Sequence, residues 1–125
     1  MKITLNPHPK DGATRDALIA EGGFGKHYTD HMVVCEWSEK DGWGEPELKP
    51  YGPISLDPAT AVFHYGQEIF EGMKAYHQPD GGIALFRPTA NAQRFIKSAA
   101  RLALPELPEN LFIETLETLV RQDAA

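Results

Sequence analysis

The chain has 125 residues, about the length of one domain, and 42% of them are hydrophobic, which predicts a substantial core. Its net charge of −6 argues against a nucleic-acid surface, because such surfaces are basic and clustered. A small molecule or another protein surface is the expected partner.

The N-terminal residues contain no apolar h-region, so a secretory signal is not expected. No apolar run reaches the length of a membrane span. Cys35 is the single cysteine and can form no internal disulfide. We interpret it as a small buried hydrophobe in a strand, because a catalytic thiolate would need positive surroundings. These features predict a soluble, cytoplasmic protein without membrane contact.

The first part of the chain predicts an arm and a strand. Residues 1–23 are rich in proline and glycine and predict an N-terminal arm with a short helical turn near residues 16–20. Residues 30–37 predict a strand, because β-branched and aromatic side chains are frequent there. We therefore expect the folded domain to cover residues 24–125.

A reversal and a second strand follow. The Asp41-Gly42 pair predicts a tight turn, because glycine readily adopts the positive φ that such turns require. The chain from Trp43 to Tyr51 then predicts a strand interrupted by prolines. Pro46 and Pro50 cannot donate to a ladder, so this strand should lie at an edge or be irregular.

The middle of the chain predicts a short helix and a hairpin. We expect the helix between Gly66 and Gly72, with Gly72 ending it. Residues 73–78 and 83–87 then predict a β-hairpin, because a Pro-Asp-Gly-Gly turn joins them.

Two helices are expected in the last third. Thr89 is the predicted N-cap of the first, which runs to about Leu102. Pro108 suits the first turn of the second, which runs towards Asp123. Strands followed by helices predict an α+β fold, with a largely antiparallel sheet flanked by helices.

Two dense segments, Phe24–Met32 and His64–Tyr76, combine aromatic, glycine and acidic residues. In this order they resemble the small N-terminal domain of branched-chain amino acid aminotransferases, which are pyridoxal-phosphate enzymes of fold-type IV. Parts of the second segment are shared more loosely with D-amino acid aminotransferases and aminodeoxychorismate lyases. Thr29–Met32, followed by Glu36 and Trp37, favours the branched-chain branch.

The resemblance implies an enzyme that exchanges an amino group between leucine, isoleucine or valine and 2-oxoglutarate, as a homodimer. It also implies an incomplete small domain over residues 24–125. The large domain, with the Schiff-base lysine, would lie beyond residue 125, so the chain alone is expected to be inactive and to hold no catalytic residue. Lys74 is expected to have a structural or surface role. The alternative is a standalone, non-catalytic binding or regulatory module.

Arg94 is the candidate cofactor-binding residue. By itself, an arginine on an amphipathic helix is usually solvated or ion-paired. An arginine fork early in a helix nevertheless suits a phosphate. The resemblance implies that Arg94 holds the phosphate of pyridoxal phosphate.

Phe24, Tyr65 and Phe70 match family positions that line the substrate's side-chain pocket. Aromatic walls would give a branched aliphatic side chain a rigid apolar surface. The alternative is that all three are ordinary core aromatics. The spacing of Phe70 from Gln67 and Met73, which fits a helical turn, favours that alternative for Phe70.

Other chemistries have little support in the sequence. Asp30 and His31 are adjacent on a predicted strand and would point to opposite faces, which argues against a catalytic dyad. The five histidines are scattered without zinc-ligand spacing, so no metal site is expected. Gly66 and Gly72 could serve either turn chemistry or a close backbone approach.

Overall fold

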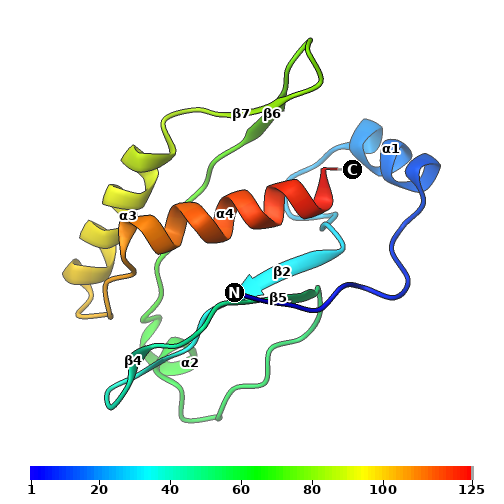
Figure 1. Ribbon diagram of the computed structural model, residues 1–125. Coiled ribbons are helices and arrows are strands. Elements are labelled where there is room, and N and C mark those ends of the chain that lie inside the picture. The colour runs from blue at the N-terminus through cyan, green and yellow to red at the C-terminus, as the bar shows by residue number, and fades with distance from the viewer. Residues whose placement is uncertain (125) are drawn as a thin grey trace. The chain divides into compact units, whose positions relative to one another are not determined.

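The computed structural model describes residues 1–124 (Figure 1). Helices alternate with short, mostly antiparallel strands, which confirms the predicted α+β class. The chain divides into two compact units. The first unit is Met1–Pro53 together with the end of the chain from Thr118, and the second is Ile54–Glu117. A boundary between an arm and a domain at residue 24 stays a prediction.

The first unit contains one helix and five short strands: β1 (Lys2–Ile3), α1 (Gly12–Glu21), β2 (His31–Val34), β3 (Trp37–Ser38), β4 (Gly42–Trp43) and β5 (Glu47–Pro50). Strand β5 lies between β1, which is parallel to it, and β2, which is antiparallel. Leu48 on β5 pairs with Val33 and with Ile3, and its side chain is fully buried. The sheet is therefore organised around Leu48.

The expected strands are shorter than predicted, and one is placed differently. The strand expected over residues 30–37 is regular only over β2. The strand expected from Trp43 to Tyr51 is interrupted between β4 and β5, as predicted from its prolines, but β5 is central rather than at an edge. The reason is that both prolines still offer their carbonyls. Pro46 accepts a bond from the Lys2 amide at 2.9 Å, and Pro50 is the last residue of its strand, where a missing N–H breaks no inner ladder. The turn before β4 is confirmed, with Gly42 at φ 72°.

Helix α1 replaces the short helical turn expected within the arm. It has ten residues because both of its ends are capped. The side chain of Asp11 accepts from the Thr14 amide at 2.8 Å, and the amide of Gly22, at φ 65°, donates to the Leu18 carbonyl. None of its residues is buried, and Ile19 remains 70% exposed. Local capping, rather than burial of an apolar face, thus defines this helix.

The second unit contains α2 (Ala61–Tyr65), β6 (Ala75–His77), β7 (Ile83–Leu85), α3 (Pro88–Arg101) and the first part of α4 (Glu109–Asp123), whose last turn belongs to the first unit. The predicted hairpin is confirmed as β6 and β7, which Figure 1 shows side by side. Gly81 supplies a positive φ of 83° at its turn. The predicted helix ending at Asp123 is confirmed as α4.

The short helix predicted between Gly66 and Gly72 is wrong. Gly66 adopts the left-handed conformation, at φ 58° and ψ 34°, and ends α2 instead of beginning a helix. Gly66 could have served either turn chemistry or a close backbone approach. A Cβ atom added at this position would meet nothing within 4 Å, which excludes a close approach. Its role is turn chemistry. Residues 66–74, which we call the linking segment, have no regular structure.

Hydrogen bonds to α3 explain why the linking segment is extended. The side chain of Gln67 donates to the Leu102 carbonyl at 2.9 Å, and the side chain of Asn91 donates to the Gly72 carbonyl at 3.2 Å. The two anchor points on α3 are separated by about 16 Å, at about 1.5 Å per helical residue. Extended chain from residue 67 to 72 covers about 16 Å, whereas a helix would cover only about 7 Å. An extended segment therefore spans the two anchors more readily than a helix would.

Helix α3 begins one residue before the predicted N-cap. Thr89 lies inside the helix, Pro88 occupies the first turn, and Arg87 is the cap residue at φ 49°. The ring of Phe95 contacts that of Phe112 on α4, with centroids 5.5 Å apart. This contact between aromatic rings packs the two helices together inside the second unit.

The core is smaller than the composition predicts. Among residues 1–124 the buried hydrophobic residues are Leu48, Ala92 and Ala99. Many large apolar side chains are exposed, including Ile19, Phe24, Ile54, Phe63, Tyr65, Phe70 and Phe86. Exposed apolar surface of this kind is typical of surfaces that bind another chain or a ligand. Within residues 1–124 no helix has the length and apolar character needed to cross a membrane.

Candidate functional site

A shallow groove of about 400 Å³ runs along α3 in the second unit. Its lining combines apolar residues, one serine and three cationic side chains. The lining residues are Ile69, Phe70, Arg94, Lys97, Ser98, Arg101 and Leu102. Arg94, Lys97 and Arg101 are three and four residues apart, so they share one face of the helix. The structure therefore brings the predicted cofactor residue, Arg94, to the same groove as the predicted substrate residue, Phe70.

Arg94 is held by Glu71 of the linking segment. Its Nε donates to Oε2 of Glu71 at 2.8 Å, and its Nη2 donates to Oε1. The side chain of Asn91 donates to the same Oε1 at 2.8 Å. The two ends of the pair differ in exposure, since the side chain of Glu71 is 5% exposed and that of Arg94 is 66% exposed. The acid is thus the fixed partner, and the guanidinium reaches solvent.

Both members of this pair stay charged over a wide pH range. The hydrogen bonds from Arg94 lower the pKa of Glu71 from 4.5 to about 2, against an opposing effect of burial, and the Asn91 bond adds to the lowering. The carboxylate in turn raises the pKa of Arg94. An ion pair that is fully charged at neutral pH therefore borders the groove.

The pairing leaves one edge of the guanidinium available. Glu71 engages the side edge, made of Nε and Nη2. One hydrogen of Nη1 and the second hydrogen of Nη2 form the end edge of the guanidinium, which can bind an anion bidentately. Arg94 is ion-paired, as an arginine on such a helix usually is, and still presents donors to a phosphate. The residues around it therefore fit the phosphate of pyridoxal phosphate.

The predicted substrate-binding aromatics are not core residues. Phe24 is 94% exposed, Tyr65 87% and Phe70 78%. Tyr65 is the last residue of α2, and Phe70 lies on the linking segment, so both belong to the second unit, whereas Phe24 belongs to the first. The interpretation of these side chains as ordinary core aromatics is therefore wrong, and their role in substrate binding stays a prediction. Lys74 is exposed at the end of the linking segment.

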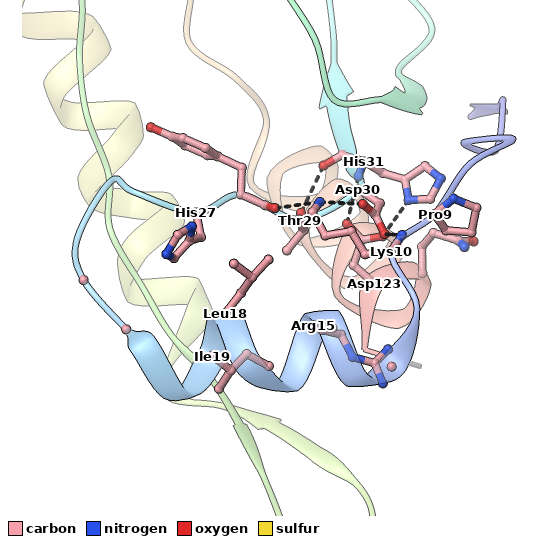
Figure 2. Close-up of a pocket in the computed structure, with 15 residues that line it drawn as sticks. Pro9, Lys10, Arg15, Leu18, Ile19, His27, Thr29, Asp30, His31 and Asp123 are labelled. Carbon is pink, nitrogen blue, oxygen red and sulfur yellow. Dashed lines mark hydrogen bonds and ion pairs between the residues drawn. The ribbon is translucent and has the colours of Figure 1, made fainter.

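A larger cavity, of about 690 Å³, lies in the first unit beside α1 (Figure 2). Four of its lining side chains bind one another in two pairs. Lys10 Nζ lies 2.6 Å from Asp30 Oδ1, and His31 Nδ1 lies 2.6 Å from Asp123 Oδ1. Because these four groups are already engaged with one another, the cavity offers a ligand fewer unengaged charged groups than the groove on α3 does. We therefore take the groove as the candidate functional site.

The pair of His31 and Asp123 was not anticipated. As predicted, Asp30 and His31 do not pair with each other, and Asp30 orders the approach to the strand by accepting from the Lys10 amide at 2.9 Å. His31 instead finds an acid 92 residues away. Its Nε2 accepts from the Asn6 amide at 2.8 Å, so Nδ1 carries the proton and donates to Asp123. No local sequence signal connects positions so far apart.

Cys35 differs from its interpretation as a buried strand residue. It follows β2 rather than lying in it, and it is only half-buried. Its Sγ donates to the Gly44 carbonyl at 3.4 Å, and partial burial raises the pKa of the thiol. A raised pKa disfavours the reactive thiolate, so a structural role fits this residue. Among residues 1–124, metal-ligating side chains form no group of three or more.

Comparison with known proteins bears out the resemblance. No family model matches the sequence. It is 54% identical over 123 residues to a probable branched-chain-amino-acid aminotransferase of Streptomyces coelicolor, covering 97% of this chain and 34% of the relative. It is 53% identical over 121 residues to a branched-chain-amino-acid aminotransferase of Mycolicibacterium smegmatis, covering 97% and 33%. A mitochondrial branched-chain-amino-acid aminotransferase of Saccharomyces cerevisiae is 46% identical over 123 residues, covering 98% and 30%. The chain thus spans about a third of the length of these relatives.

Proposed function

We propose that this chain is part of a branched-chain amino acid aminotransferase that uses pyridoxal phosphate. The observation that carries the proposal is the identity of 54% over nearly the whole chain with a relative of that printed name. The cationic groove on α3 supports it from the structure, because it offers an anion-binding edge where the resemblance expects the cofactor phosphate. The function proposed is amino transfer between branched-chain amino acids and 2-oxoglutarate.

In this proposal the described residues bind and orient. Arg94 holds the cofactor phosphate through the end edge of its guanidinium. Lys97 and Arg101 add positive charge along the same face of α3. When bound, pyridoxal phosphate supplies the electron-withdrawing ring that allows the amino group to be exchanged. The Schiff-base lysine is proposed to lie outside residues 1–125, in the part of the relatives that this chain does not span.

The exposed aromatics are proposed to select the substrate. Phe24, Tyr65 and Phe70 would form apolar walls around the branched side chain, which gains about 0.8 kcal/mol for each buried CH₂ group. Their exposure supports a surface completed by other parts of the enzyme or by a second subunit. We propose a homodimer on the same ground. A cytoplasmic location is proposed from the single half-buried thiol.

The proposal is tested in the full-length enzyme, meaning the protein that carries residues 1–125 at the length of its relatives. It should transfer the amino group of leucine, isoleucine and valine to 2-oxoglutarate. Turnover of D-alanine without turnover of leucine would refute the substrate class and favour a D-amino acid aminotransferase.

The cofactor role of Arg94 has its own measurement. Arg94→Ala should weaken pyridoxal phosphate binding by about 10- to 100-fold, because it removes a charge-assisted contact of about 1.5–3 kcal/mol. Lys40→Ala is the matched control, since Lys40 is an exposed cation in the turn between β3 and β4. An unchanged cofactor dissociation constant in the Arg94 variant would exclude this residue as the phosphate ligand.

A further inference from the structure

We propose that Glu71 is a positioning residue, which binds the side edge of Arg94 and thereby orients the end edge of the guanidinium, made of Nη1 and Nη2, towards the cofactor phosphate. This inference rests on the proposed function and adds a residue to it. It concerns how the anion site is built before any ligand arrives. The geometry that supports it lies entirely within the second unit.

The first support is that Glu71 is itself fixed. Its Oε1 accepts from both Arg94 and Asn91, and Asn91 also donates to the carbonyl of Gly72, the next residue of the linking segment. The segment is tied to α3 again by Gln67 at its other end. A carboxylate with this many partners cannot swing away, so it holds the guanidinium plane in one orientation.

The second support is the asymmetry of exposure. Here the acid is 5% exposed and the arginine 66% exposed, so the buried charge supports one that faces the groove. Arginine loses side-chain freedom when it binds a ligand, and fixing it beforehand reduces that loss. A held guanidinium is therefore a better phosphate ligand than a free one.

The charge of Glu71 acts on phosphate binding in the opposite direction. The negative charge of Glu71 neutralises part of Arg94 and repels a phosphate, so its removal would strengthen binding if charge alone mattered. The three cations of the groove outnumber this one carboxylate, which keeps the site positive with Glu71 in place. Positioning and simple electrostatics thus predict changes of opposite sign.

The experiment compares Glu71→Gln with the wild type in the full-length enzyme. The dissociation constants of pyridoxal phosphate and of phosphate-free pyridoxal are measured by absorbance titration. We expect binding of the phosphorylated form to weaken by about tenfold, as is typical when a group that orients a ligand-binding residue is lost. Binding of pyridoxal should not change. Glu68→Gln is the control, because Glu68 lies on the same segment and its side chain is exposed.

Each result supports or overturns the inference. Equal or tighter binding of pyridoxal phosphate in Glu71→Gln overturns it, and equal weakening of both ligands also does, because that reports general damage to the site. If Glu71→Gln does not fold, Asn91→Ala decides, since it removes one bond to Glu71. A loss of about threefold confined to the phosphorylated ligand then supports the inference, and no loss overturns it.

Failure of this inference is distinguishable from failure of the proposed function. If Arg94→Ala weakens cofactor binding and Glu71→Gln does not, Arg94 remains the phosphate ligand and only the positioning role falls. If neither variant changes the dissociation constant, the groove is not the phosphate site, and the proposed role of Arg94 falls with it.

Discussion

Each unit contains a pair in which a well-buried acid is held by a basic side chain, and the two pairs differ in the hydrogen-bonding capacity that the basic partner leaves unused. In the first unit, His31 is 4% exposed and Asp123 is 9% exposed. In the second, Glu71 is 5% exposed and Arg94 is 66% exposed. Both pairs have short contacts and a well-buried acid, so contact distance alone does not separate them.

The difference lies in the unused hydrogen-bonding capacity of the basic partner. Both ring nitrogens of His31 are engaged, Nδ1 with Asp123 and Nε2 with the amide of Asn6. Such a histidine has no atom left for a ligand, which makes its role structural. Arg94 gives only its side edge to Glu71 and keeps donors that face solvent. A buried acid thus stabilises the fold in one unit and supports a binding group in the other.

The largest expected effect is on stability and concerns the pair of His31 and Asp123, in which both ring nitrogens are engaged. His31→Ala removes the partner of a buried carboxylate and the acceptor of the Asn6 amide, so the free energy of unfolding should fall by about 3 kcal/mol. Urea denaturation of the 125-residue chain measures it. His8→Ala is the control, because His8 is exposed, and it should change stability by less than about 0.5 kcal/mol. A similarly small change in His31→Ala would show that the pair contributes little to the fold.

A smaller effect is expected from the pair in the second unit when the pH is lowered. The folded-state pKa of Glu71, about 2, lies below its usual value of 4.5. The stabilisation is therefore fully present above about pH 4.5 and is lost as the pH falls towards 2. We expect a loss of about 1–2 kcal/mol, less than the whole shift would give, because solvent screens the exposed arginine.

Carbon NMR of the Glu71 carboxyl group measures this titration directly, and denaturation at neutral and acidic pH measures its effect on stability. Arg94→Ala should return the pKa of Glu71 towards its usual value, because the hydrogen bonds from Arg94 are the largest cause of the lowering. A carboxyl that still titrates near 2 in that variant would mean that Asn91 and the backbone hold the charge instead.

The elements that were predicted correctly from the sequence are those set by local interactions. The hairpin of β6 and β7 and the helix α4 were predicted correctly, because the turn glycines and Pro108 act on the backbone within a few residues. The linking segment was predicted wrongly as a helix. Its form depends on two tertiary hydrogen bonds, from the Gln67 side chain to the Leu102 carbonyl and from the Asn91 side chain to the Gly72 carbonyl. Tertiary hydrogen bonds overrode the local pattern there.

The candidate site was predicted in part for the same reason. Arg94 and Phe70 were singled out by resemblance, and the structure brings both to one groove. Glu71 lies in the segment that carries the resemblance, yet its pairing with an arginine 23 residues later has no local signature. The pair of His31 and Asp123, 92 residues apart, is further still from sequence reasoning. Both acids were recognisable only after the fold placed their partners.

The smallest expected effect sharpens the comparison by separating contact from charge within the groove. Lys97 lies one turn after Arg94 on the same face of α3 and lines the same groove. Because it adds positive potential without the held geometry of Arg94, Lys97→Ala should weaken binding of pyridoxal phosphate to the full-length enzyme by only about twofold at physiological salt. At about 1 M salt the Debye length shrinks to about 3 Å, so the difference from wild type should vanish.

The effect of Arg94→Ala should persist at high salt, because direct hydrogen bonds are screened far less than distant charges. Lys40→Ala again serves as the control, and a loss in Lys97→Ala that survives high salt would mean that Lys97 contacts the phosphate directly.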